Sequence, residues 1–182
     1  RGNDFVLGGR PSLADFALYG VLQAVLFRDP ESGAYMERLA PLVTGWIARV
    51  EAARAGEGEL LAADEIPSSL LPILKRQMSE QIPVLADTAR ALEAWSVAQP
   101  TGARIKRTLG AQEFTIGGRL GERSISTFPL WRLQRIQDLY RAMAGADRAR
   151  ADALLESVGG RQLVDMRIPV RLARRDFRLV IA

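Results

Sequence analysis

The spacing of apolar residues predicts a mainly helical chain. Residues 16–27 are apolar apart from a few positions such as Gln23. A helix that is apolar on nearly every side is typical of one enclosed by other helices, so we expect residues 16–27 at the centre of a bundle. Further helices are predicted at residues 34–39, 41–55, 71–98, 130–144 and 148–158.

Some segments depart from simple helical spacing. Pro83 falls inside the pattern of residues 71–98, which predicts either a kink or two abutting helices. Residues 112–127 alternate between apolar and polar side chains around several glycines, which indicates a β-hairpin. Residues 168–181 are compatible with a second strand pair that turns near residues 174–176.

A capping motif precedes the apolar helix. Gly8, Gly9 and Pro11 indicate a turn, and Ser12-Leu13-Ala14-Asp15 follows directly. We expect the Ser12 hydroxyl to accept from the backbone N–H of Asp15, while the Asp15 carboxylate accepts from the N–H of Ser12. The alternative is a hydroxyl–carboxylate pair in an active site, but without a base to activate the hydroxyl we favour capping.

Composition narrows the possible chemistry. The 182 residues include neither cysteine nor histidine, which excludes disulfides, zinc sites of the Cys/His type, thiolate nucleophiles and imidazole bases. No catalytic residue and no metal site is therefore assigned. Gly117-Gly118-Arg119-Leu120-Gly121 lacks the Gly-Lys-Ser/Thr ending of a phosphate loop, so a hairpin turn is the better interpretation.

Positive charge is concentrated at the end of the chain. Residues 161–182 hold six arginines against two acidic residues, whereas the preceding 160 residues are balanced at 19 basic and 19 acidic. The arginines could bind nucleic acid or an acidic surface. Apolar residues alternate with them and Phe177 is their only aromatic neighbour, so a solvated strand face or a domain interface is favoured, and nucleic acid is the least favoured partner.

Residues 5–19, from Phe5 through the Ser12–Asp15 box to Tyr19, resemble a stretch of the C-terminal helical domain of glutathione S-transferases. In that family a turn and a Ser/Thr-x-x-Asp box open the central helix, and the role of the box is in folding. The spacing from Pro41 to Trp46 and Val50 is similar to the end of the same domain. The resemblance covers residues 5–55, continues weakly through 70–160 and is absent from 161–182.

The resemblance implies an all-α fold with a hairpin inserted in a C-terminal extension. We expect residues 1–60 to form the core of the helical domain, 61–160 an extension with the hairpin near 112–127, and 161–182 a basic tail with β character. The chain opens without a methionine or an apolar leader, so we expect a fragment of a longer cytoplasmic protein.

The resemblance also implies a function for the parent protein. A missing thioredoxin-like domain would bind glutathione, the co-substrate, and this chain would shape the pocket for a hydrophobic electrophile, with no cofactor of its own. The fragment alone is not expected to turn over glutathione. Expected partners are the missing domain, the electrophile and a second copy in a homodimer, with no membrane. A non-catalytic adaptor module is the alternative.

Overall fold

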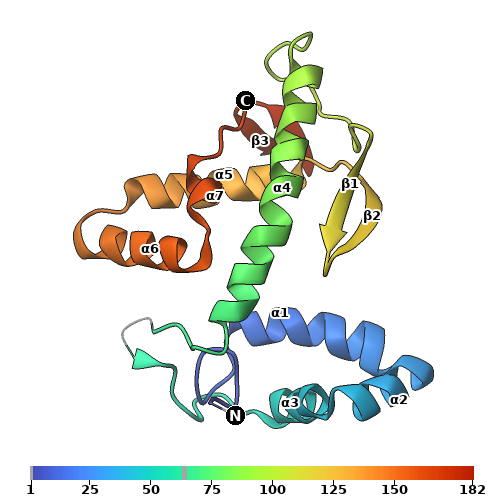
Figure 1. Cartoon of the computed structure of the whole chain (residues 1–182), viewed down its shortest axis with the longest axis vertical. Coiled ribbons are helices and arrows are strands. Elements are labelled where there is room, and N and C mark those ends of the chain that lie inside the picture. The colour runs from blue at the N-terminus through green and yellow to red at the C-terminus, as the bar shows by residue number, and fades with distance from the viewer. Residues whose placement is uncertain (1, 63–64) are drawn as a thin grey trace. The chain divides into compact units, whose positions relative to one another are not determined.

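The computed structural model describes residues 2–62 and 65–182. The chain divides into two compact units, Arg1–Leu71 (unit 1) and Pro72–Ala182 (unit 2), and each is described by itself. Within the described residues there are seven α-helices, one π-helical segment and two antiparallel β-hairpins (Figure 1). The chain is therefore mostly helical, as its periodicity predicts.

Unit 1 is built from helices that start at capping residues or at prolines. Helix α1 (Leu13–Val21) follows Ser12 and continues into the π-helical segment η1 (Leu22–Phe27). Helices α2 (Pro30–Leu39) and α3 (Pro41–Ala52) each begin with proline, whose fixed φ suits the first helical position. Asp29 caps α2 by accepting from the N–H groups of Glu31 and Ser32, which is why α2 begins earlier than residue 34.

The loop before α1 is fastened to the segment after α3. Gly9 N–H donates to Glu59 O at 2.7 Å, and Leu61 N–H donates to Leu7 O at 2.9 Å. A Cβ at Gly8, whose φ is 134°, would stand 2.7 Å from Glu59 O, so only glycine allows this approach. The two ends of unit 1 are therefore held together at the start of α1.

The expected enclosure of residues 16–27 is wrong for this chain. Although all of these residues are described, none is buried; Phe16 is 53% exposed, and Val21 and Val25 are exposed as well. Within unit 1, α2 and α3 pack against α1 and η1, and no further described helix of the unit covers their remaining surface. The apolar residues on all sides of 16–27 therefore belong to a helix that has one face uncovered within unit 1.

Unit 2 begins with a long helix. Helix α4 (Leu71–Ser96) is a single 26-residue element with Pro83 inside it, so the two abutting helices of one prediction do not form. Its buried residues include Leu85, Ala89 and Leu92, which pack with apolar residues from later segments. Those partners are Ile105, Leu130, Leu133 and Leu172.

The hairpin predicted within residues 112–127 is confirmed. Strands β1 (Ala111–Ile116) and β2 (Arg119–Ser124) are antiparallel, with Ile116 opposite Arg119. Gly117 and Gly118 both have positive φ, the requirement of a two-residue turn that matches strand twist. The turn is shorter than the five-residue Gly117–Gly121 segment read from the sequence.

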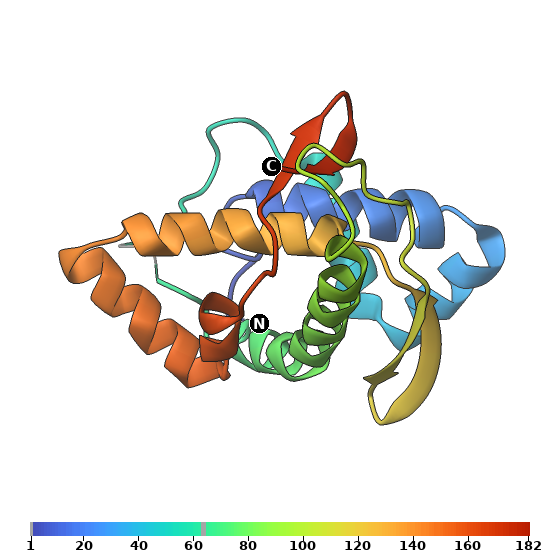
Figure 2. The same cartoon turned by 90° about the horizontal axis from the view of Figure 1, so that it is seen from above.

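The rest of unit 2 comprises three helices and a second hairpin. Helices α5 (Phe128–Ala142), α6 (Gly145–Val158) and α7 (Arg161–Asp165) precede strands β3 (Leu172–Arg175) and β4 (Arg178–Ile181). The segment of residues 102–105 pairs with the other edge of β4, because Ile105 N–H donates to Leu179 O at 2.9 Å and Ile181 N–H donates to Ala103 O at 3.0 Å. Figure 2 shows this segment beside the hairpin.

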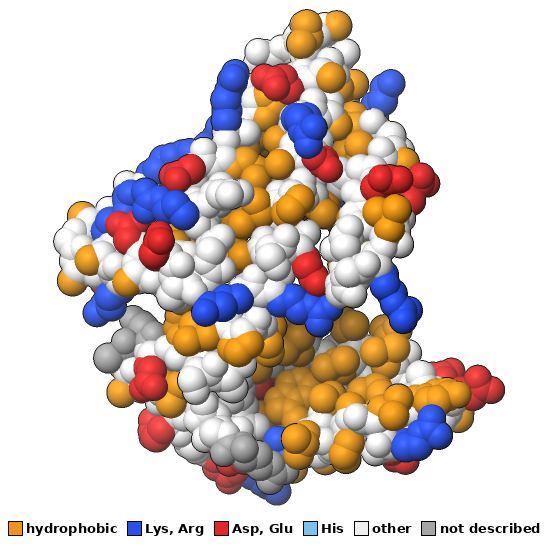
Figure 3. Space-filling model, viewed as in Figure 1, with side chains coloured by type: hydrophobic (Ala, Val, Ile, Leu, Met, Phe, Trp, Pro, Cys, Tyr) orange, Lys and Arg blue, Asp and Glu red, His pale blue; other side chains and the backbone are white. Residues whose placement is uncertain are grey.

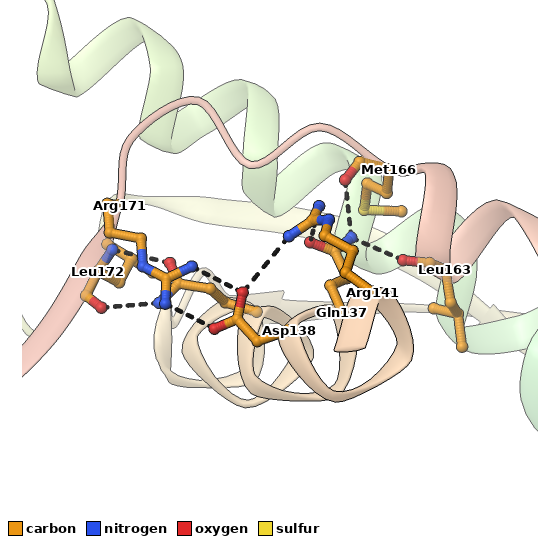
Figure 4. A network of polar contacts seen from close by, with 8 residues as sticks. Gln137, Asp138, Arg141, Leu163, Met166, Arg171 and Leu172 are labelled. Carbon is orange, nitrogen blue, oxygen red and sulfur yellow. Dashed lines mark hydrogen bonds and ion pairs between the residues drawn. The ribbon is translucent and has the colours of Figure 1, made fainter. Parts of the chain in front are cut away.

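Two buried glutamines of α5 fasten the C-terminal segment, and Figure 4 labels one of them, Gln137. Gln134 accepts from Leu172 N–H and donates to Leu172 O, each at 2.9 Å, as a neighbouring strand would. Gln137 donates to the carbonyls of Leu163 and Met166, both at 2.8 Å. An exposed bidentate pair of Arg171 with Asp138 lies beside them, at 2.8 and 2.6 Å. The Gln134 amide thus takes the place of a neighbouring strand at Leu172, and the Gln137 amide satisfies carbonyls at the end of α7.

Replacing Gln134 with leucine should destabilise unit 2. The variant Gln134→Leu leaves the buried N–H and C=O of Leu172 without partners, at about 1–3 kcal/mol each, so we expect a loss of roughly 2–6 kcal/mol. Chemical denaturation and hydrogen exchange at the Leu172 amide measure the effect. The exposed Gln81→Leu change is the control, and equal behaviour of the two variants would contradict this role.

Candidate functional site

A buried carboxylate organises the start of α1. Asp15 is 0% exposed, and both of its oxygens accept two hydrogen bonds. Oδ2 accepts from Ser12 N–H at 2.8 Å and from Ser12 Oγ–H at 2.7 Å, while Oδ1 accepts from Val6 N–H at 2.9 Å and Trp46 Nε1–H at 3.1 Å. One side chain therefore joins the preceding loop, the first turn of α1 and helix α3.

The Asp15 carboxylate is held in its ionised form. Burial by itself raises the pKa of this group, but hydrogen bonds from Ser12, Val6 and Trp46 outweigh it, and the net pKa lies below the ordinary 3.8. The positive end of the α1 dipole favours the same state. With four donors and no exposed surface, Asp15 is unsuited to exchanging protons with a substrate.

The structure brings together the residues that the sequence singled out, with two additions. Ser12 is the N-cap of α1, and Ser12 and Asp15 form the reciprocal pattern of a capping box. Sequence reasoning missed Val6 and Trp46 as further partners of Asp15. Trp46 could have been found from the sequence, because a tryptophan that packs in a core needs a hydrogen-bond acceptor for its indole N–H. In the structure this indole is half-buried. No pattern marks the backbone N–H of Val6.

An open pocket lies beside this capping box, entirely within unit 1. Its volume is about 540 Å³. Leu13 and Phe16 project from the first turns of α1, with exposures of 85% and 53%. The remaining lining comes from the loop before α1 and the segment after α3: Arg10, Pro11, Ser12, Ala53, Arg54, Ala55, Gly56, Glu57 and Leu60.

The pocket combines apolar surface with two arginines and one glutamate, Glu57. Among the described residues, neither Arg10 nor Arg54 forms an ion pair. Leu13, Phe16 and Leu60 offer apolar area to a ligand, and removing such area from water is worth about 25 cal/mol per Å². The arrangement can bind an apolar molecule and has no group placed to activate a nucleophile.

Exposed apolar side chains continue from the pocket along the helix. We call this surface the α1–η1 face, and Figure 3 shows hydrophobic side chains gathered over it. Its members are Leu13, Phe16, Leu18, Val21, Val25 and Leu26. A contiguous apolar surface of this kind is typical of a ligand or partner site.

Four other aromatic residues make contacts within their own units. Tyr19 in unit 1 donates its hydroxyl to Glu51 at 2.9 Å, and this bond raises the pKa of Tyr19. In unit 2, Trp95 and Trp131 pack against the core, and Tyr140 is buried and donates to Asp152 at 2.5 Å.

Among residues 2–62 and 65–182, no group of three or more acidic side chains is arranged to hold a metal ion. None of the helices in these ranges combines the length and apolarity needed to span a membrane.

The family resemblance is supported at the N-terminal end. Residues 1–49 match the family model of the glutathione S-transferase C-terminal domain. This segment includes α1, η1, α2 and most of α3, and hence Ser12, Asp15 and Trp46. The match ends at residue 49 and gives no support to the weaker resemblance expected for residues 70–160. No curated protein and no solved structure shows a significant match to the chain.

Removing the Ser12 hydroxyl should weaken the start of α1. The variant Ser12→Ala loses a cap and one donor to Asp15, so we expect about 1 kcal/mol less stability, the usual effect of a lost cap. Thermal melting and hydrogen exchange in the first turn of α1 measure this. Ser157→Ala, at an exposed site in unit 2, is the control. An unchanged melting temperature in Ser12→Ala would show that the hydroxyl does not cap α1.

Asp15→Asn should cost more stability than Ser12→Ala and should alter its pH dependence. The amide offers one acceptor oxygen to four donors. Because the folded pKa of Asp15 lies below 3.8, its carboxylate stabilises the fold fully above that value, and the contribution disappears as pH falls through the folded pKa. Denaturation of both proteins between about pH 5 and pH 2 tests this. A constant difference between the wild type and Asp15→Asn across the range would refute the assignment.

Proposed function

We propose that this chain is the helical part of a glutathione S-transferase-like protein and shapes the pocket for a hydrophobic electrophile. The observation that carries the proposal is the match of residues 1–49 to the C-terminal domain of that family. Glutathione is then the co-substrate of the parent protein, bound by a thioredoxin-like domain. A cytoplasmic setting and a homodimer belong to the same proposal.

The pocket beside the capping box supports this role. Leu13, Phe16 and Leu60 present apolar side chains to one space of about 540 Å³, within the range of small-molecule sites. The buried bonds of Asp15 hold the first turn of α1, so Leu13 and Phe16 are mounted on a fixed backbone. We assign the chain a role in binding and orienting the electrophile, since proximity can supply much of the rate of a two-substrate reaction.

The chain itself carries no activator for the glutathione thiol in this proposal. Cysteine and histidine do not occur in it, and Ser12 is engaged with Asp15. Ser12 and Asp15 are therefore assigned to capping, and the thiolate chemistry to the thioredoxin-like domain. By itself the chain would bind an electrophile without conjugating it.

A non-catalytic adaptor is the second candidate, favoured by the extent of the α1–η1 face. Val21, Val25 and Leu26 lie beyond the small-molecule pocket, yet they are exposed and apolar. In an adaptor these residues would contact a protein partner, and substitutions there would weaken that association without affecting a small ligand in the pocket.

A binding experiment with matched variants tests the pocket. The probe is 8-anilinonaphthalene-1-sulfonate, an apolar aromatic dye with one negative charge. Phe16→Gln removes a large apolar contact, worth about 1.5–3 kcal/mol when fully buried, so we expect binding at least about tenfold weaker. Leu39→Gln is the control, because Leu39 is exposed and apolar but lies outside the pocket lining.

The parent protein gives the second readout. There, Phe16→Gln should raise KM for the electrophile and leave KM for glutathione unchanged. Equal dye affinity in Phe16→Gln and Leu39→Gln would refute the pocket. A parent protein that conjugates no electrophile, with Val25→Gln abolishing a protein complex, would support the adaptor instead.

A further inference from the structure

Unit 2 contains a second pocket, formed by segments far apart in the sequence. Its volume is about 460 Å³. Residues 104–107 form one wall beside β4, residues 126–128 lead into α5, and residues 177–179 belong to the β3–β4 hairpin. We call it the hairpin pocket, and it shares no residue with the pocket of unit 1.

The cations of this pocket lack acidic partners. Arg104, Lys106, Arg107 and Arg178 are exposed, and none forms an ion pair with a described residue. Other arginines of the basic tail do: Arg161, Arg167 and Arg171 contact Asp152, Asp165, Glu93 and Asp138. The tail therefore divides into paired arginines that fasten the fold and uncompensated ones on the hairpin. The fold adds three more uncompensated cations from residues 104–107.

An exposed aromatic ring stands at the turn of the hairpin. Phe177 is 88% exposed, and its φ is 59°, a left-handed conformation that is uncommon for bulky residues. Asp176 also has positive φ, so the two form a turn whose second position normally favours glycine. The Arg174 guanidinium lies 5.3 Å from the ring centroid. The backbone thus adopts an unfavourable conformation at the residue that presents a phenyl ring to solvent.

Hydrogen-bonding groups complete the pocket. Thr127 is 4% exposed, precedes α5 as its N-cap and lines the pocket. Its hydroxyl makes no capping hydrogen bond to α5, and the N-terminal end of this 15-residue helix follows directly. Phe128, a second pocket-lining ring, begins that helix. A hydroxyl and a helix N-terminus are suited to a phosphate oxygen.

We propose that the hairpin pocket binds single-stranded nucleic acid. The four uncompensated cations contact successive phosphates, Thr127 donates to one of them, and a base stacks on Phe177. Stacking platforms flanked by positive charge are the usual means of holding single strands without sequence preference. This assignment is independent of the proposed function of unit 1.

Single strands fit the site better than a duplex or a membrane. A single exposed ring can stack on an unpaired base, whereas bases in a duplex are already stacked. A membrane-inserting tip would need several apolar side chains, but the neighbours of Phe177 in the turn are Arg174, Arg175, Asp176 and Arg178. The charge and the lone aromatic ring therefore favour a strand of exposed bases.

Fluorescence anisotropy with a labelled oligothymidylate of about 12 nucleotides tests the proposal on the full chain. Affinity should fall as salt rises, with a log–log slope of about −3 for four neutralised phosphates. The paired change Lys106→Gln and Arg107→Gln should reduce the slope by about 1.4. Arg28→Gln with Arg119→Gln removes the same charge elsewhere and should leave the slope unchanged.

The ring is tested by a substitution that suits the turn. Phe177→Gly should weaken oligothymidylate binding about tenfold through lost stacking, while the melting temperature stays level or rises because glycine relieves the positive φ. Phe177→Leu keeps the bulk and the backbone conformation but should lose a similar share of the affinity. A purely structural ring would give the opposite result, with lower stability and unchanged affinity.

Defined outcomes overturn the proposal. These are no binding at low salt, equal affinity for a duplex or for poly(aspartate) of the same charge, or binding only to vesicles of phosphatidylserine and phosphatidylcholine. Affinity that is unchanged in Phe177→Gly would overturn it too. Salt-dependent binding that requires both Phe177 and the Lys106–Arg107 pair would establish it.

Discussion

Unit 1 depends on the burial of one charge. An ionised carboxylate cannot be removed from water unless hydrogen bonds replace its hydration, and Asp15 receives four of them. The donors belong to three different segments of the chain. Their hydrogen bonds to Asp15 therefore fix the positions of the loop at Val6, the N-cap at Ser12 and helix α3 at Trp46. The position of Leu13 and Phe16, and with it the pocket, follows from that constraint.

Local chemistry made much of the fold predictable. The box at Ser12 and Asp15, the proline that opens α3, and the Gly117-Gly118 turn each depend on residues close together in the chain, so the sequence indicates them directly. Pro83 misled in one respect, because α4 continues through it as a single helix supported by packing on its buried face. The helix propensity of a residue does not include the stabilisation that such packing provides.

Long-range features could not be predicted. Apolarity on every side of residues 16–27 is the same pattern whether neighbours cover the helix or leave it open, so the uncovered α1–η1 face came only from the structure. The pocket of unit 1 joins α1 to Leu60, and the hairpin pocket joins residues 104–107 to Phe177. In both cases the pocket is lined by segments that are far apart in the sequence. Residue spacing does not indicate that such segments lie close together in the fold.

The π-helical geometry of η1 has a consequence for whatever meets this helix. Arg28 N–H donates to Gln23 O at 2.9 Å, five residues back, so the chain here turns less per residue than in α1. Four residues pass beyond a full turn in an α-helix but fall short of one in a π-helix. Val25 is therefore displaced around the axis to the other side of Val21 from where an α-helix would place it. A partner that contacts both residues must match this offset and not that of a regular helix.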